Sequence, residues 1–289
     1  MPYIPGTVLD GMSATLGSVA LGSVDSDGVA WYLQTLEGWD SADVRAEFTE
    51  READHGAWAS PVYLGARPIT LGGTVVAPSR TLLQAAMDRL QVAAGLSDTL
   101  LTVAEAVPKQ AVVRRSGKLL MQYVSDTVAT YSVMVTAADP RRYSSTLSTG
   151  TTNLASSTGG LTFPITFPIT FSATVVAGQI AAVNSGTADT RPVLTLTGPV
   201  VAPVISALYP DGTARLLTYQ QDLQTGDVLT IDTDAHTVVI NGGVTRRRFM
   251  TVSGGWPTIP AGQQVVYQFL SSTYNASPTL TVTWRSAWM

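Results

Sequence analysis

Hydrophobic and polar residues alternate along much of the chain, which is the pattern of β-strands with one buried face. The alternation is cleanest in four stretches, where every second residue is apolar and most residues between are Thr or Ser. Their apolar positions are Tyr131, Val133 and Val135; Leu194 and Leu196; Leu229 and Ile231; and Leu280, Val282 and Trp284. Turn signals such as Pro210-Asp211-Gly212 and Asn241-Gly242-Gly243 separate the later strands. Short strands with close turns predict a β-sandwich or jelly roll for the second half of the chain.

One stretch has the periodicity of an amphipathic helix instead. Ser79 is a plausible N-cap and Gly95 a plausible stop signal, so we expect a helix over about residues 79–94. Its apolar stripe consists of Leu82, Leu83, Ala86, Met87 and Leu90. The first half of the chain is therefore predicted to contain strands plus one helix.

The middle of the chain has no charged residue between Arg142 and Asp189. This stretch opens with a Ser/Thr/Gly-rich piece, residues 144–160, that predicts a loop. A Thr-Phe-Pro-Ile repeat follows at 162–171, and its parity places five apolar side chains on one face of an extended segment. These are Phe163, Ile165, Phe167, Ile169 and Phe171. Because proline cannot donate a ladder hydrogen bond, the segment is either an edge strand of the core or an arm along a second domain or a neighbouring subunit.

These patterns together predict a mostly β protein in two domains. We expect an N-terminal β domain with one helix over residues 1–145. A family resemblance, described at the end of this section, implies that this domain forms rings. An uncharged linker with the Phe/Pro/Ile arm follows over 146–172, and a C-terminal β-sandwich over 173–289.

Composition narrows the class of protein. The chain has 289 residues, of which 45% are hydrophobic and 13% charged, against about 25% charged in an ordinary domain. Thr occurs 38 times and favours pleated, half-buried surface. This composition excludes a coiled coil, a helical bundle and a charge-rich disordered chain. The first residues have no basic or apolar segment, so no signal peptide is expected, and no apolar run reaches the length of a membrane span.

The candidate chemistry is sparse. The formal net charge of −4 argues against a dedicated nucleic-acid binder, and the absence of Cys excludes thiol catalysis. His55 and His236 lie in different predicted domains, neither has a companion His or Cys at ligand spacing, and no nucleophile elbow or phosphate loop occurs. The acidic pairs at 25–27 and 232–234 fit Asx turns better than calcium loops. We therefore expect no catalytic residue, no metal and no cofactor.

Arginines and aromatic residues supply the remaining candidates for contact surfaces. Arg246, Arg247 and Arg248 follow a Gly-Gly turn, and they form either a solvated face or a partner contact. Aromatic residues crowd the first domain and the end of the chain, and we expect most of them in the core. They are Trp31, Tyr32, Trp39, Trp58 and Tyr63, and then Trp256, Tyr267, Tyr274, Trp284 and Trp288.

The order of motifs resembles a known family. The elements are Leu36-Glu37-Gly38-Trp39, Val44-Arg45, Asp54-His55-Gly56 and then Tyr63-Leu64-Gly65-Ala66-Arg67-Pro68-Ile69-Thr70-Leu71-Gly72-Gly73. Together they resemble the N-terminal domain of siphophage distal tail proteins, and most of all the minor tail proteins of actinobacterial phages. In the second half, segments 184–187, 192–198, 226–233 and 256–262 resemble the galectin-like sandwich of that family. Gly38, Trp39, Arg45, Gly65, Arg67 and Gly72 are the candidate structural motif, with Arg45 and Arg67 expected to pair with acids or carbonyls.

The resemblance implies a structural virion protein at the distal end of a long non-contractile tail, assembled in the cytoplasm of the bacterial host. It implies a homohexameric ring that joins the tail-tube protein to the tip or baseplate hub protein. The tape-measure protein and DNA would pass through the lumen without specific binding, and the protein would not insert into a membrane. Two rival functions remain at this point: a carbohydrate-binding module that contacts the host surface, and a polysaccharide hydrolase with two carboxylates across a cleft.

Overall fold

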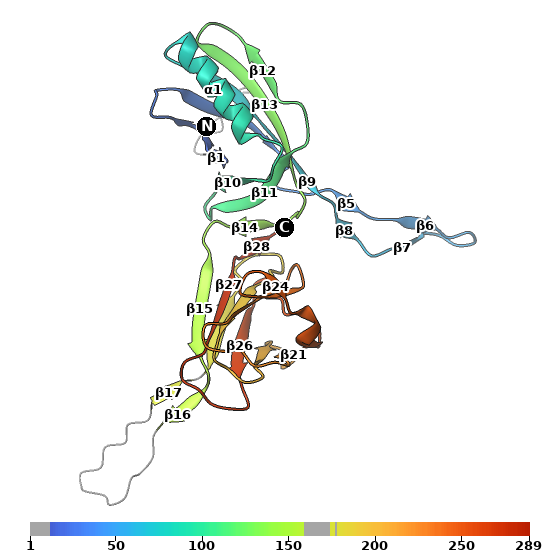
Figure 1. The fold of residues 1–289 in the computed structure, drawn as a ribbon. Helices are drawn as coiled ribbons and strands as arrows, with labels where there is room; N and C mark the ends of the chain where they lie inside the picture. The colour runs from blue at the N-terminus through green and yellow to red at the C-terminus, as the bar shows by residue number, and fades with distance from the viewer. Residues whose placement is uncertain (1–11, 159–173, 177) are drawn as a thin grey trace, which may run out of the picture. The chain divides into compact units, whose positions relative to one another are not determined.

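The computed structural model describes residues 12–158, 174–176 and 178–289. The chain divides into two compact units, unit 1 with residues 1–145 and 289 and unit 2 with residues 146–288. Each unit has its own hydrophobic core. The structure is mostly β, with a single α-helix among the described residues, which confirms the predicted fold class (Figure 1).

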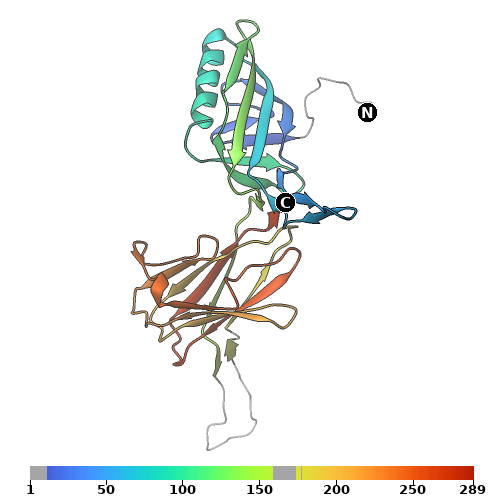
Figure 2. The ribbon, with the colours of Figure 1, turned by 90° about the vertical axis from the view of Figure 1, so that its right-hand side faces the viewer.

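Unit 1 is built on one antiparallel sheet in the order β2-β1-β10-β11-β13-β9-β4-β3, with β12 added beside β13 and β14 beside β11. The two ends of this path are joined in sequence, because only Gly22 separates β2 from β3, and the Gly22 amide donates to the carbonyl of Trp31 in β4. The sheet therefore curls around its own core (Figure 2). Its strands are β1 (Ser13–Leu16), β2 (Val19–Leu21), β3 (Ser23–Val24), β4 (Ala30–Glu37), β9 (Arg67–Val76), β10 (Thr99–Ala104), β11 (Lys109–Arg115), β12 (Leu120–Tyr123), β13 (Val128–Ala137) and β14 (Arg142–Ser144).

Helix α1 (Arg80–Ala93) supplies one wall of that core with its predicted apolar stripe. The Ser79 side chain caps the helix by accepting from the Leu82 amide at 3.3 Å, as the sequence predicts. The helix ends at Ala93, with Ala94 as its C-cap and Gly95 directly after the cap. Leu83, Met87 and Leu90 are fully buried against the sheet, and each contributes about 1.5–3 kcal/mol of burial.

A long hairpin leaves the sheet between β4 and β9. It consists of two short ladders: β5 (Val44–Arg45) pairs with β8 (Tyr63–Leu64), and β6 (Phe48–Glu50) pairs with β7 (Ala57–Ala59). Figures 1 and 2 show this hairpin projecting away from the sheet of unit 1 as a narrow two-stranded extension.

Unit 2 is a sandwich of two antiparallel sheets, as predicted for the second half of the chain. One sheet has the order β15-β27-β19-β22-β23-β24 and the other β18-β26-β20-β21-β25, and their inner faces share one core. The first sheet contains β15 (Ser148–Asn153), β19 (Val193–Thr197), β22 (Val228–Asp232), β23 (Thr237–Ile240), β24 (Val244–Thr245) and β27 (Thr279–Trp284). The second contains β18 (Gln179–Val183), β20 (Val204–Leu208), β21 (Ala214–Tyr219), β25 (Met250–Ser253) and β26 (Gln264–Leu270). Strands β16 (Ser156–Thr158) and β17 (Thr174–Val176), the 3₁₀ turn Arg247–Phe249 and β28 (Ala287–Trp288) complete the elements.

All four alternating stretches of the sequence form strands with the predicted inward face. Their apolar positions are buried in β13, β19, β22 and β27. The loop expected at 144–160 needs correction, because residues 148–153 form β15 and pair with β27 over six residues. Thr favours strands, and Gly has no side chain that could obstruct pairing. This segment therefore forms an edge strand, although its composition is typical of a loop. The Phe/Pro/Ile arm at 163–171 lies outside the described residues.

No helix among the described residues is long and apolar enough to span a membrane.

Candidate functional site

The root of the hairpin is a buried polar cluster in unit 1. Gly38 and Trp39 precede the hairpin and Arg67 follows it, so the cluster joins its two ends. The Arg67 side chain is fully buried. It donates from Nε to the carbonyl of Pro140 at 2.8 Å and from Nη1 to the carbonyl of Trp39 at 2.6 Å. These bonds offset part of the cost of burying the charge, although the Nη2 atom has no hydrogen-bond partner among the described residues. They are the carbonyl contacts that the sequence predicts.

The backbone conformation at position 38, at the root of the hairpin, requires a glycine. Its φ is +77°, and a Cβ at this position would lie 1.9 Å from the carbonyl oxygen of Pro68. No other residue fits without moving the start of strand β9. Gly72 lies in β9 opposite Thr35, where a Cβ would meet the Thr35 Cβ at 3.3 Å. The Gly65 amide donates to the Asp43 carbonyl at 2.6 Å, across the base of the hairpin.

An acidic residue that the sequence did not single out completes the cluster. Glu105 accepts from the indole Nε1 of Trp39 and from Lys109, and it lies 3.7 Å from Arg142. Burial would raise the pKa of Glu105, but these donors and the nearby positive charges outweigh it and hold the pKa below its usual value. The Arg142 guanidinium also lies over the Trp39 ring at 5.5 Å. The one feature of the sequence that could have indicated a role for Glu105 is that Lys109 lies four residues after it.

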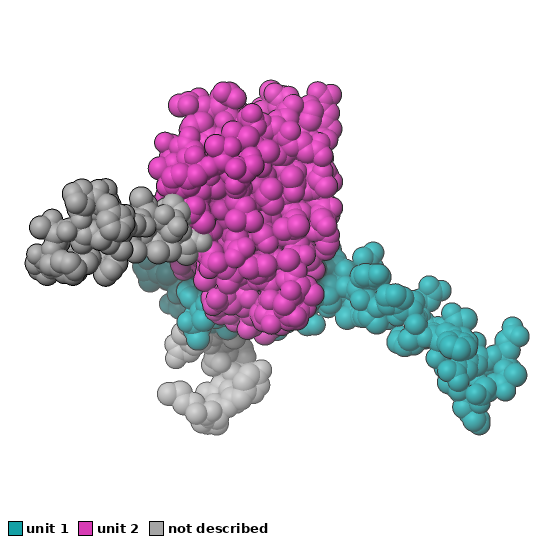
Figure 3. Space-filling view, turned by 90° about the horizontal axis from the view of Figure 1, so that it is seen from below, with its two compact units in different colours: residues 1–145, 289 teal, residues 146–288 magenta. Residues whose placement is uncertain are grey.

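Beyond the root, most of the hairpin is exposed. Every residue from Val44 to Ala59 is exposed, although the segment contains Phe48 and Trp58, with exposed fractions of 65% and 67%. The expectation that most aromatic residues lie in the core is therefore wrong for the first domain, where Tyr32, Trp58 and Tyr63 are exposed, and it is also wrong for Tyr274 near the end of the chain. Within the described part of unit 1, no further strand pairs with this two-stranded ribbon, and its side chains stay exposed. Figure 3 shows part of unit 1 as a narrow teal extension.

Arg45 is also exposed, on β5, and its side chain makes no ion pair or hydrogen bond within the described part of the chain. Its expected pairing is therefore wrong. The local signal for an exposed hairpin was the charge density between the aromatic residues. Four carboxylates (Glu47, Glu50, Glu52 and Asp54) lie within eight residues.

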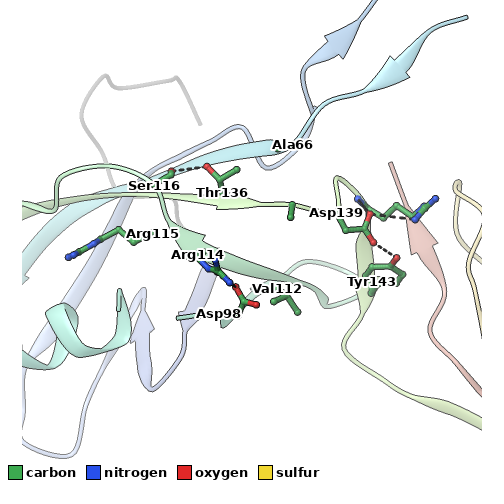
Figure 4. A pocket seen from close by; sticks show the side chains of 11 residues that line it. Ala66, Asp98, Val112, Arg114, Arg115, Ser116, Thr136, Asp139 and Tyr143 are labelled. Carbon is green, nitrogen blue, oxygen red and sulfur yellow. Dashed lines mark hydrogen bonds and ion pairs between the residues drawn. The ribbon is translucent and has the colours of Figure 1, made fainter. Parts of the chain in front are cut away.

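A groove of about 550 Å³ opens on the outer side of β11 and β13 in unit 1 (Figure 4). Arg114, Arg115 and Arg141 line it with Asp98 and Asp139, and Val112 exposes an apolar side chain there. Arg114 pairs with Asp98 at 2.8 Å, and Asp139 pairs with Arg141 and accepts from the Tyr143 hydroxyl. The side chain of Arg115 has no ion pair or hydrogen bond among the described residues.

The arginine run of unit 2 lies against aromatic rings. The guanidinium groups of Arg246 and Arg248 lie 5.8 and 4.4 Å from the Phe249 ring, and that of Arg247 lies 5.0 Å from the Trp256 ring. His236 stacks on the same Trp256 at 4.8 Å. These contacts account for the position of the run, because a cation over an aromatic face is stabilised there. Arg247 and Arg248 are exposed, so the partner contact stays a prediction.

The acidic turns and the histidines form no site. Asp25 accepts from the Asp27 and Val29 amides and pairs with Arg89 at 2.7 Å, while Asp232 accepts from the Asp234 and Ala235 amides. Both are the predicted Asx turns. Within the described ranges, no group of three or more His, Asp or Glu side chains is placed to hold a metal ion.

Comparison with known proteins finds one matching family model and several solved structures with a similar fold. Residues 185–288, within unit 2, match the family model of the siphovirus-type tail component, C-terminal domain. The whole fold is similar to the crystal structure of SPP1 Dit, described as a paradigm of the hub adsorption apparatus in phages that infect Gram-positive bacteria. The TM-score is 0.66 at 12% identity, over 96% of this chain and 99% of that chain.

A chain of the phage P2 baseplate in its activated, calcium-containing conformation is also similar. Its TM-score is 0.52 at 9% identity, over 94% of this chain and 97% of that chain. No curated protein matches the sequence significantly. The predicted resemblance to siphophage distal tail proteins is thus confirmed: residues 185–288 match the family model of a siphovirus-type tail component, and the fold is similar to that of SPP1 Dit.

Proposed function

We propose that this protein is a structural component of the distal end of a long non-contractile phage tail, where it forms a ring, expected to be a hexamer. The observation that carries this proposal is the match along nearly the full length of both this chain and SPP1 Dit. A fold alone does not specify a function. The family match of residues 185–288 to a siphovirus-type tail component supplies the more specific support.

In this role, one side of the ring meets the tail-tube protein and the other meets the tip or baseplate hub protein. The tape-measure protein and DNA pass through the lumen. The charge of the chain supports this role, because a protein with a net charge of −4 does not retain passing phosphates through counterion release. The ring is assembled in the cytoplasm of the bacterial host and remains in the virion.

We assign the chain no catalytic step. The two carboxylates of the unit 1 groove each pair with an arginine, so neither is placed as an unpartnered general acid or base across a cleft. No observation favours the carbohydrate-binding alternative either. The half-buried Trp256 ring is already contacted by His236 and Arg247, and it is not a bare stacking platform for a sugar.

Antibody labelling of phage particles that carry this chain tests the proposal. Gold-conjugated antibody against the purified protein is expected at the distal tip of the tail in negative-stain micrographs. An antibody against the capsid serves as the positional control. Label along the whole tail tube, or on the capsid alone, would contradict the proposed position. The mass of the ring released from particles gives the stoichiometry, for which we expect six copies.

A further inference from the structure

Four arginines gather at one edge of unit 2 with no opposite charge paired to them. They are Arg215 on β21, and Arg246, Arg247 and Arg248 at the 3₁₀ turn. None of the four forms an ion pair among the described residues. Figures 1 and 2 show the 3₁₀ turn as a short helical ribbon at the edge of unit 2. Since like charges held close together repel, this edge carries a positive potential that the fold of unit 2 does not neutralise.

The aspartates of unit 2 are used elsewhere. Unit 2 contains six arginines, six aspartates and no Lys or Glu. Asp234 pairs with Arg191. The other five aspartates each accept from a backbone amide; they are Asp189, Asp211, Asp222, Asp227 and Asp232. Residues 235–289 contain four arginines and not one Asp or Glu. The negative charge that complements this edge therefore has to come from another molecule.

Aromatic rings and backbone carbonyls hold the arginines in place. Arg247 lies over the Trp256 ring at 5.0 Å and donates from Nη1 to the carbonyl of Met250 at 2.9 Å. Arg215 lies over the Tyr209 ring at 4.9 Å and donates from Nη1 to the carbonyl of Trp256 at 2.6 Å. A guanidinium has five N–H donors, so both arginines keep donors for a ligand. Because the groups are positioned before a ligand arrives, less entropy is lost on binding.

Two further side chains complete this surface. Arg248 follows Arg247 in the turn and is exposed, with its guanidinium 4.4 Å from the Phe249 ring. His236 is exposed as well and stacks on the Trp256 ring at 4.8 Å. Trp256 thus connects nitrogen donors from three segments of unit 2: β21, the turn between β22 and β23, and the 3₁₀ turn.

We propose that this surface, the Trp256 cluster (Arg215, His236, Arg247, Arg248 and Trp256), is a binding site for phosphate groups. A phosphate ester carries a charge of about −1.5 to −2 at pH 7 and three acceptor oxygens, so it can accept from several guanidinium groups at once. Arginine suits this ligand because its planar fork donates two parallel hydrogen bonds to phosphate oxygens. A single carboxylate supplies one charge and two oxygens, which leaves most of the cluster without a partner.

The cluster fits a phosphate ligand without bases. Proteins that bind single-stranded nucleic acid offer aromatic rings on which bases stack, whereas the rings of Trp256 and Phe249 are already contacted by cations. A strong binder of duplex DNA neutralises on the order of ten phosphates along the helix, and a cluster of this size reaches fewer. The site belongs to unit 2 alone, so it depends neither on the proposed ring nor on the position of the chain in the particle.

Calorimetric titration of the full-length protein with inorganic tripolyphosphate tests the site, and we expect saturable binding. Arg247→Gln with Arg248→Gln should raise the dissociation constant by roughly tenfold or more, because charge-assisted hydrogen bonds are lost. The matched control is Arg80→Gln with Arg114→Gln, which removes the same charge from exposed arginines of unit 1 that each have an aspartate partner. At an ionic strength of about 0.15 M this control should stay within about twofold, because salt screens charges outside the site.

A lysine pair separates the charge of the cluster from its geometry. Arg247→Lys with Arg248→Lys keeps both charges but loses the planar forks, so we expect a dissociation constant between those of the natural protein and the glutamine pair. Both arginines are exposed, and far-UV circular dichroism and thermal unfolding of all variants are therefore expected to stay unchanged. A loss of binding then reports on the site and not on the fold.

Further ligands identify the chemistry. Tripolyphosphate that binds more tightly than glycerol 3-phosphate supports a polymer that displays several phosphates, and equal affinities support a small phosphate ester. Poly-L-glutamate that binds as tightly as tripolyphosphate would indicate an acidic protein segment and overturn the phosphate site. A single-stranded oligonucleotide that binds more tightly than tripolyphosphate would overturn it too. So would the absence of tripolyphosphate binding, or binding that the glutamine pair leaves unchanged.

Discussion

Trp39 and Trp58 are nineteen positions apart in one unit, yet they occupy opposite environments. Trp39 is 1% exposed, and its indole donates to Glu105 under the guanidinium of Arg142. Trp58 is 67% exposed on β7, with only Arg51 over its ring. The same residue type thus serves as core at the root of the hairpin and as free surface farther along it.

This difference shows where unit 1 concentrates its stability. The root is fixed from both sides, since Arg67 after the hairpin donates to the carbonyls of Gly38 and Trp39 before it. The hairpin beyond is held by two short ladders, and no other described strand pairs with it. A rigid root with an uncovered ribbon is suited to presenting that ribbon to another molecule.

The largest expected effect comes from the same substitution at the two tryptophans. Trp39→Ala should lower the free energy of unfolding of unit 1 by about 3–5 kcal/mol, because it leaves a cavity and removes a donor to the half-buried Glu105 carboxylate. Trp58→Ala should change it by less than about 0.5 kcal/mol, as an exposed substitution does. The urea dependence of hydrogen exchange in β9 and β13 measures both. Equal losses at the two positions would mean that the hairpin is packed as part of the core.

The sequence predicted what depends on local periodicity. The parity of Tyr131, Val133 and Val135 in β13 follows directly from a strand with one buried face. The stripe and cap of α1 follow from helix geometry, with Ser79 as the capping residue. Both features are decided by neighbouring residues, so a single sequence is sufficient to find them.

What the sequence did not predict depends on whether a further layer exists in space. Trp58 and Tyr63 are residue types common in core strands, but no third strand or helix among the described residues of unit 1 covers the hairpin. The motif residues Arg45 and Arg67 look alike in sequence, and only the positions of the Pro140 and Trp39 carbonyls make one a buried donor. Residues as distant in sequence as Glu105 and Trp39 meet through sheet pairing, which periodicity does not specify.

The two motif arginines sharpen the comparison with an effect of intermediate size. Arg67→Met should cost unit 1 about 2–4 kcal/mol, because the carbonyls of Pro140 and Trp39 lose their buried donor while much of the side-chain volume is kept. Arg45→Met should change the free energy of unfolding by less than about 0.5 kcal/mol, because its guanidinium is exposed on the hairpin. Hydrogen exchange in β9 and thermal unfolding of the full chain report both values. A loss at Arg45 as large as that at Arg67 would show that the hairpin contributes to the folded core.

The smallest expected effect is a pH dependence confined to the root. Burial acts to raise the pKa of Glu105, but the donors Lys109 and Trp39 and the charge of Arg142 lower it below the ordinary 4.5 in the folded protein. A lowered pKa in the folded state means that the carboxylate stabilises unit 1 fully above its unfolded pKa. This stabilisation is lost as the pH falls through the folded pKa.

Glu105→Gln should therefore lower the free energy of unfolding by about 1–2 kcal/mol near pH 7. The gap, meaning the difference in this free energy between the variant and the natural protein, should narrow as the pH drops below 4.5. Glu50→Gln on the exposed hairpin is the matched control and should stay within about 0.5 kcal/mol near pH 7. Unfolding of the full chain in urea at a series of pH values between 3 and 7 measures this gap. A Glu105→Gln gap that stays constant across the series would show that the Glu105 charge does not stabilise the root, leaving only its shape and hydrogen bonds to hold Trp39 in place.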